Sequence, residues 1–122
     1  MKISAFAFLF FIVLGAGMAN GKTFTLTTNM SDDFAFVGPD GTKNPTLEVH
    51  EGDVVELILQ NDDGAPHLIT IPELDVKSAR VDTLGEQTIV KFVAKKGEFT
   101  YFCPVPGHRR LGMEGKIICL NR

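Results

Sequence analysis

Residues 101–115 of the 122-residue chain read Tyr-Phe-Cys-Pro-Val-Pro-Gly-His-Arg-Arg-Leu-Gly-Met-Glu-Gly. A thiol, an imidazole and a thioether follow one another here as Cys103, His108 and Met113, with four residues between successive members. The Pro and Gly residues favour a tight loop, which we expect to join two strands. A second imidazole, His67, lies upstream at the start of a predicted strand, after the turn signal of residues 61–64.

The side chains in and near this loop are those that favour copper. Soft sulfur ligands combined with imidazole select copper, and two His with one Cys in a near-trigonal plane and a weak axial Met form the blue-copper electron-transfer site. Thiolate binds both oxidation states, and the thioether is too weak to impose the tetragonal geometry that Cu(II) prefers. The sequence therefore predicts one copper ion per chain, with His67, Cys103, His108 and Met113 as its metal ligands.

Short segments on both sides of the loop have the patterns of β-strands. Residues 23–27 alternate apolar and hydroxyl side chains, and the other segments are short apolar runs that end near Gly, Pro, Asn or Asp. We predict strands over residues 23–27, 34–37, 46–49, 54–59, 67–71, 88–93, 98–102 and 116–120. About eight strands at a spacing of roughly ten residues predict an all-β fold, an antiparallel Greek-key β-sandwich. We expect one turn of helix at most, over residues 75–80.

The first 19 residues have the composition of a secretory signal peptide. Lys2 precedes an almost unbroken apolar run, and Gly17 and Ala19 are the small residues that cleavage requires. We therefore expect residues 1–19 to be a signal peptide and residues 20–122 to form one domain in the periplasm or outside the cell. The apolar part of this segment barely reaches the length of a spanning helix, which favours a cleaved signal over a membrane anchor. We expect membrane contact only if the signal is not cleaved.

The ligand loop and the segment before His67 together resemble one known family. Cys103–His108 followed by Leu111–Gly115 is similar to the ligand loop of the cupredoxins, above all rusticyanin and its sulfocyanin relatives. Residues 51–61 resemble the family's segment before its upstream His ligand, and the resemblance extends over residues 24–120. It implies a small electron carrier, not an enzyme, whose redox partner proteins, such as cytochromes or oxidases, dock near His108.

The charge of the chain excludes one class of partner. Without Lys2, 11 basic residues stand against 15 acidic residues, a net charge of −4. Domains that bind nucleic acid normally carry a basic excess, so we expect no nucleic-acid partner. Arg109 and Arg110 directly follow His108 and would orient an acidic partner protein. We expect the domain to be a monomer.

Two residues depart from the family pattern beside the expected thiolate. Leu68 follows His67, where the family often has Asn or Ser with a side chain that donates toward the Cys sulfur. Pro104 has no backbone N–H to offer next to the sulfur. Hydrogen bonds of this kind tune a metal site, and the sequence leaves open what replaces them.

Other interpretations of the same residues remain open. Two cysteines in an exported protein commonly form a disulfide, but a Cys103–Cys119 bond would leave the two His and the Met unexplained. We expect Cys119 to be a small buried side chain. Glu114 is an alternative axial ligand, as a carboxylate is in red-copper nitrosocyanin. The alternative functions are a red-copper catalyst and a copper-delivery protein. Three His residues are too few for the second copper site that a multi-copper reductase requires.

Overall fold

The computed structural model describes residues 20–30 and 34–122 of the chain. The expected signal peptide, residues 1–19, lies outside the described residues, so its cleavage and the export of the domain stay predictions. Within the part of the chain that the structure describes, no helix is long and apolar enough to cross a membrane.

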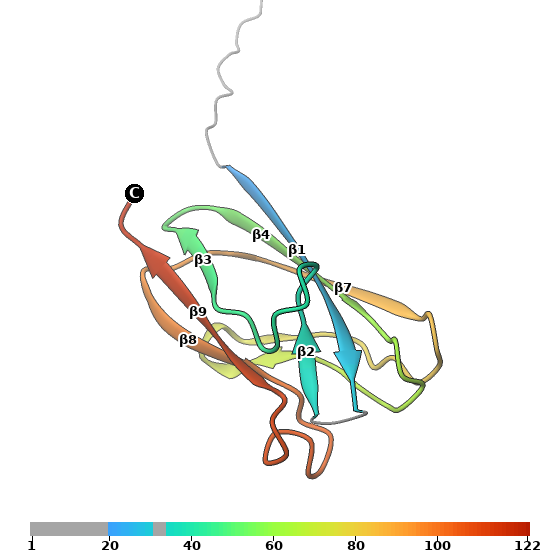
Figure 1. Ribbon diagram of the computed structural model, residues 1–122. Coiled ribbons are helices and arrows are strands. Elements are labelled where there is room, and N and C mark those ends of the chain that lie inside the picture. The colour runs from blue at the N-terminus through green and yellow to red at the C-terminus, as the bar shows by residue number, and fades with distance from the viewer. Residues whose placement is uncertain (1–19, 31–33) are drawn as a thin grey trace, which may run out of the picture.

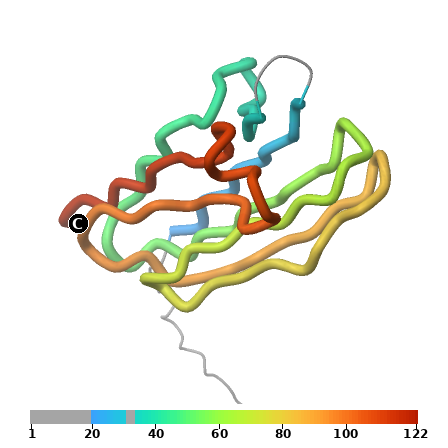
Figure 2. Tube along the Cα trace, turned by 90° about the horizontal axis from the view of Figure 1, so that it is seen from below, coloured from blue at the N-terminus to red at the C-terminus, as the bar shows by residue number. Residues whose placement is uncertain are grey.

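The described residues form two β-sheets that pack face to face (Figures 1 and 2). One sheet has the order β2-β1-β4-β7, with the strands β1 Gly21–Asn29, β2 Ala35–Val37, β4 Val54–Gln60 and β7 Gln87–Val93. The other has the order β3-β9-β8-β5-β6, with the strands β3 Leu47–His50, β9 Glu114–Leu120, β8 Gly97–Phe102, β5 Thr70–Ile71 and β6 Val76–Lys77. The predicted all-β sandwich is confirmed, and each predicted strand overlaps an observed one.

Two of the strand pairings run parallel within this otherwise antiparallel sandwich. β1 pairs with β4 and β3 pairs with β9 in the parallel sense. A parallel pair requires a crossover connection. Between β1 and β4 the chain visits the second sheet at β3, and between β3 and β9 it visits the first sheet at β4 and β7. The crossovers tie the two sheets together into one core.

Alternating side chains of the strands fill the space between the sheets. Along β4, the side chains of Val55, Leu57 and Leu59 are buried. Along β9, Ile117 and Cys119 belong to the same core, as expected for Cys119. Because successive side chains of a strand point to opposite faces, this period of two places the apolar residues on the inner face of each sheet.

The expected helical turn lies at a different place in the chain. A single 3₁₀ turn, η1, spans Pro72–Leu74, and residues 76–77 form β6. Pro72 suits the first position of the turn because its φ is already close to the helical value. Asp75 ends the turn with a left-handed φ of 55°. The helix expected over residues 75–80 is therefore wrong.

The loop between β8 and β9 lies at the end of the sandwich opposite the C-terminus (Figure 1). The β8–β9 ladder begins with the pair Gly97 and Cys119 and ends with the pair Phe102 and Glu114. The loop that contains the predicted metal ligands therefore starts where the regular hydrogen bonding of the core sheet stops, on a rigid base.

Candidate metal centre

The ends of β8 and β9 bring the first and last predicted ligands of the loop together. Cys103 follows the last residue of β8, and Met113 precedes the first residue of β9. The Cys103 N–H donates to the Met113 carbonyl (3.1 Å), and the Met113 N–H donates to the His108 carbonyl (3.0 Å). Gly107 and Gly112 have φ values of 87° and 132°, which glycine adopts without strain. These contacts close the loop around the fully buried side chain of Met113.

Three donor atoms converge at the base of this loop. The Cys103 Sγ lies 3.5 Å from the His108 Nδ1 and 4.0 Å from the His67 Nδ1, and ligand atoms of the three residues all lie within 4.8 Å of one another. A sulfur and a nitrogen that bind one metal ion at about 2.3 and 2.0 Å lie roughly 3.7 Å apart at a trigonal angle. The observed spacing therefore fits a single ion, and the set of one thiol and two imidazoles forms a possible copper site.

His67 reaches this point from the connection between β4 and β5. Its N–H donates to the Val81 carbonyl (2.9 Å), and the Val81 N–H donates back to the His67 carbonyl (2.8 Å). The strand predicted over residues 67–71 is in fact this isolated bridge followed by the short β5. The side chain of His67 is completely buried, and its Nε2 lies 2.9 and 3.0 Å from the two carboxylate oxygens of Asp63.

A buried asparagine organises the turn that carries this carboxylate. The Oδ1 of Asn61 accepts hydrogen bonds from the N–H groups of Asp63 (3.1 Å) and Gly64 (2.7 Å). Its Nδ2 donates to the carbonyls of Ala65 (2.6 Å) and Val81 (3.2 Å). All the hydrogen-bonding positions of one side chain are thus used to hold residues 61–65 against the bridge that carries His67.

The comparisons with known proteins agree with this fold. The family model described as a cupredoxin-like domain matches residues 2–119. The chain belongs to the cupredoxin family. No curated protein matches this cupredoxin significantly.

Three solved structures illustrate what this cupredoxin resembles. The copper nitrite reductase of Nitrosomonas europaea is 25% identical with a TM-score of 0.71, over 84% of this chain and 42% of that chain. Rusticyanin from Thiobacillus ferrooxidans is 24% identical with a TM-score of 0.63, over 83% and 78% of the two chains. Auracyanin A, a blue copper protein from Chloroflexus aurantiacus, is 21% identical with a TM-score of 0.63, over 82% and 99%. This cupredoxin spans less than half the length of the nitrite reductase.

Backbone groups replace the side-chain donor that the sequence lacks beside the thiol. Burial raises the pKa of the Cys103 thiol, while hydrogen bonds from the backbone of Leu68 and Val105 act in the opposite direction and favour the thiolate. Leu68 has an apolar side chain, but its backbone N–H is a donor whatever the side chain is. The residue after Pro104 supplies the second donor, so the departures at both positions leave the sulfur with hydrogen-bond partners.

His108 is the least buried of the three donors, with 8% of its surface exposed. Burial, and then the neighbouring His67, lower its pKa, so its imidazole favours the neutral form that metal binding requires. Phe34 packs edge-on against the ring with 4.8 Å between centroids. Sequence reasoning assigned Phe34 only to a strand, because nothing local to residue 34 indicates its contact with the loop.

The alternative pairing of the two cysteines is wrong. Cys103 and Cys119 are both free and buried. Cys119 pairs with Gly97 at the far end of the β8–β9 ladder, whereas Cys103 follows the near end. Six residue steps at about 3.4 Å put the two Cα atoms roughly 20 Å apart, whereas a disulfide requires less than about 7 Å.

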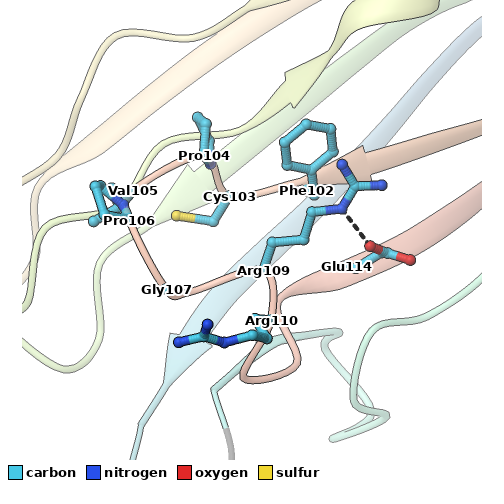
Figure 3. A pocket seen from close by; sticks show the side chains of 9 residues that line it. All are labelled: Phe102, Cys103, Pro104, Val105, Pro106, Gly107, Arg109, Arg110 and Glu114. Atoms are coloured by element: carbon cyan, nitrogen blue, oxygen red, sulfur yellow. Dashed lines mark hydrogen bonds and ion pairs between the residues drawn. The ribbon is translucent and has the colours of Figure 1, made fainter.

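The outer face of the loop carries the charged residues (Figure 3). The guanidinium of Arg109 lies 3.8 Å above the centre of the Phe102 ring, and its Nε donates to the Glu114 carboxylate. Glu114 has a half-exposed side chain, and Figure 3 shows it directed toward Arg109 and away from the Cys103 sulfur. Glu114 is thus held in an ion pair with Arg109 on the exposed side of the loop.

Proposed function

We propose that this cupredoxin binds one copper ion through His67, Cys103 and His108, with Met113 as the axial ligand, and carries single electrons. The observation that supports the proposal is the convergence of one thiol and two imidazole nitrogens in a buried site. When bound, the metal supplies the one-electron couple between Cu(I) and Cu(II). The protein's own residues supply the ligands and the surroundings that keep their arrangement the same in both states.

Burial and hydrogen bonding support the transfer of electrons at this site. His67, Cys103 and Met113 are fully buried, so water has little access to a metal held between them. The loop hydrogen bonds and the bridge to Val81 hold the ligands before any metal arrives. A preorganised and dry site needs little rearrangement when its charge changes, which favours fast electron transfer.

The same features favour a carrier over a catalyst. Catalysis at a metal requires an open coordination position for the substrate, and the four proposed ligands here would fill or cover the coordination sphere. His50 pairs with Leu120 at the end of the β3–β9 ladder, remote from the other two His residues. Among the described residues, His67, Cys103 and His108 form the one cluster of at least three metal-binding side chains.

The proposed setting of this activity is outside the cytoplasm. Residues 1–19 supply the export signal in this proposal, and residues 20–122 act as the carrier in the periplasm or the extracellular space. The redox partner, a protein such as a cytochrome or an oxidase, docks where the edge of His108 reaches the surface. Leu111, with 54% of its surface exposed, lies on the same loop and offers an apolar contact.

Reconstitution of the metal-free protein with Cu(II) tests the proposal. We expect one copper ion per chain and an intense visible absorption band from charge transfer between the thiolate and Cu(II), which bleaches reversibly on reduction. The Cys103→Ala variant loses this band. The Cys119→Ala variant is the matched control and keeps it, because Cys119 lies in the core at the other end of the ladder.

Other outcomes would favour the alternative functions. A red product would indicate carboxylate or water ligation and a catalytic site. Release of copper to a partner at each turnover would indicate delivery. A colourless protein in the presence of Cu(II), or a band that survives in Cys103→Ala, would overturn the proposed site.

A further inference from the structure

The Asp63 carboxylate contacts His67, one of the proposed metal ligands. The carboxylate faces the Nε2 atom of the buried imidazole with both oxygens, at 2.9 and 3.0 Å. Its side chain is only 15% exposed, so water screens the interaction poorly. This Nε2 atom is the one that does not face the Cys103 thiol.

The carboxylate is held before it meets the imidazole. The Asp63 N–H donates to the Oδ1 of the buried Asn61, and the Asp63 Oδ1 accepts a hydrogen bond from the Ala65 N–H at 2.9 Å. Gly64 provides the turn between them with a φ of 81°. The orientation of the carboxylate is thus set by the backbone of residues 61–65, and is independent of whether a metal is present.

This geometry determines which nitrogen of His67 carries the proton. The oxygens of a carboxylate accept hydrogen bonds, so the Nε2 that faces both of them is the ring nitrogen that donates its N–H. The Nε2 is therefore protonated, and the Nδ1 keeps its lone pair in the direction of the Cys103 sulfur. The hydrogen bond of one ring nitrogen selects the other as the metal ligand.

We propose that Asp63 is a positioning residue that fixes His67 as an Nδ1 ligand and stabilises bound Cu(II) relative to Cu(I). The proposal rests on the proposed copper site. The carboxylate makes the imidazole a stronger donor, and its negative charge stabilises the more highly charged ion. The electron that separates the two states comes from or goes to the redox partner, and Asp63 changes only the balance between them.

The Asp63→Asn variant tests the proposal with little change of shape. The amide oxygen can still accept the Ala65 N–H, but the charge is lost and the amide no longer dictates which His67 nitrogen is protonated. We expect Cu(II) to bind about 10- to 100-fold more weakly, Cu(I) to be affected less, and the reduction potential to rise. Each tenfold difference between the two losses corresponds to about 59 mV for one electron.

The Asp62→Asn variant is the matched control. It removes the same charge from the adjacent residue, which is exposed and accepts a hydrogen bond from the Gln60 side chain. We expect its potential and its Cu(II) affinity to stay close to those of the wild type. Equal shifts in the two variants would indicate a general effect of net charge and would overturn a specific role for Asp63.

A measurement on the metal-free wild type separates this proposal from the copper site itself. Long-range ¹H–¹⁵N NMR spectra report which ring nitrogen of His67 carries the proton. We expect the Nε2–H form in the wild type and in Asp62→Asn, and a mixture of both forms in Asp63→Asn. An Nδ1–H form in the wild type would overturn the role of Asp63 even if copper binds. Failure to bind copper, with the Nε2–H form present, would instead overturn the proposed function.

Discussion

Gly115 of β9 lies directly opposite Tyr101 of β8, and the phenol ring occupies the space that a side chain at residue 115 would need. The hydroxyl of Tyr101 extends past the strand and donates to the Pro45 carbonyl at 2.7 Å. Tyr101 comes two residues before Cys103, and Gly115 comes two residues after Met113. The contact therefore fixes the base from which the proposed ligand loop projects.

The Gly115→Ala variant tests this contact. The added methyl group would overlap the Tyr101 ring, which is fully buried and cannot move aside freely. We expect a loss of about 1–3 kcal/mol in the free energy of unfolding, the usual cost of overpacking, measured by urea denaturation. Gly21→Ala is the control, because nothing lies within 4 Å of a Cβ there. Equal stability of the two variants would contradict the close packing.

The stability of the metal-free protein should fall at alkaline pH because of the same tyrosine. Burial raises the pKa of Tyr101 above its ordinary value of 10.0. Above pH 10 the unfolded chain loses the phenolic proton while the folded chain keeps it, so the free energy of unfolding decreases as pH rises. Between pH 9 and 11 the free energy of unfolding should fall by about 1.4 kcal/mol more in the wild type than in Tyr101→Phe. Urea denaturation at each pH measures the free energy of unfolding. If it falls equally in the two proteins, Tyr101 is not the cause of the alkaline loss.

The side chain of Met113 should tune the potential of the bound copper. The residue is fully buried, and its backbone is hydrogen-bonded to the backbone of Cys103 and of His108. We expect Met113→Leu to raise the reduction potential and Met113→Gln to lower it, because a weaker axial ligand disfavours Cu(II) and a stronger one favours it. Potentiometric titration measures both. If neither variant shifts the potential, Met113 is not the axial ligand.

The two arginines of the loop should change the rates at which charged redox reagents oxidise the copper protein, with a sign that depends on the charge of the reagent. Arg110→Glu should slow oxidation by an anionic complex such as ferricyanide and speed oxidation by a cationic cobalt complex, since surface charge steers encounter. Arg109→Glu should have an effect of the same sign, because it changes the local charge by the same amount and leaves Glu114 without its ion-pair partner Arg109. Stopped-flow rates at several ionic strengths measure these changes. Unchanged rates with both reagents would mean that electrons leave elsewhere.

Local patterns were sufficient to predict most strands and the members of the ligand loop. The apolar run over residues 54–59, followed by the turn signal of residues 61–64, predicts β4 almost to its ends, because both are properties of consecutive residues. The turn near residues 72–75 is less predictable. Its place depends on Pro72 and on the left-handed Asp75, whereas the sequence pattern suggested a helix one turn later.

Asp63 and Phe34 show why part of the site escaped prediction. In the sequence, Asp63 is part of an Asn-Asp-Asp-Gly turn, and such residues are common in turns for their local hydrogen bonds alone. The spacing of four residues between Asp63 and His67 is the only local signal of their contact. Phe34 is distant from His108 in the chain, so its edge-on contact follows only from the packing of the residue before β2 against the loop, where the Phe34 backbone also lies close to Gly112.

By itself, the sequence determines the chemistry of this protein: the donor types, their spacing in the loop and the period of two that makes strands. These are properties of residues close together in the chain, so they can be read without coordinates. Tertiary structure decides that His67, 36 residues before Cys103, presents its Nδ1 to the thiol. Only the pairing of β5 with β8 in one sheet brings the segments of His67 and Cys103 within a few ångströms, because no local preference of the backbone acts over that separation.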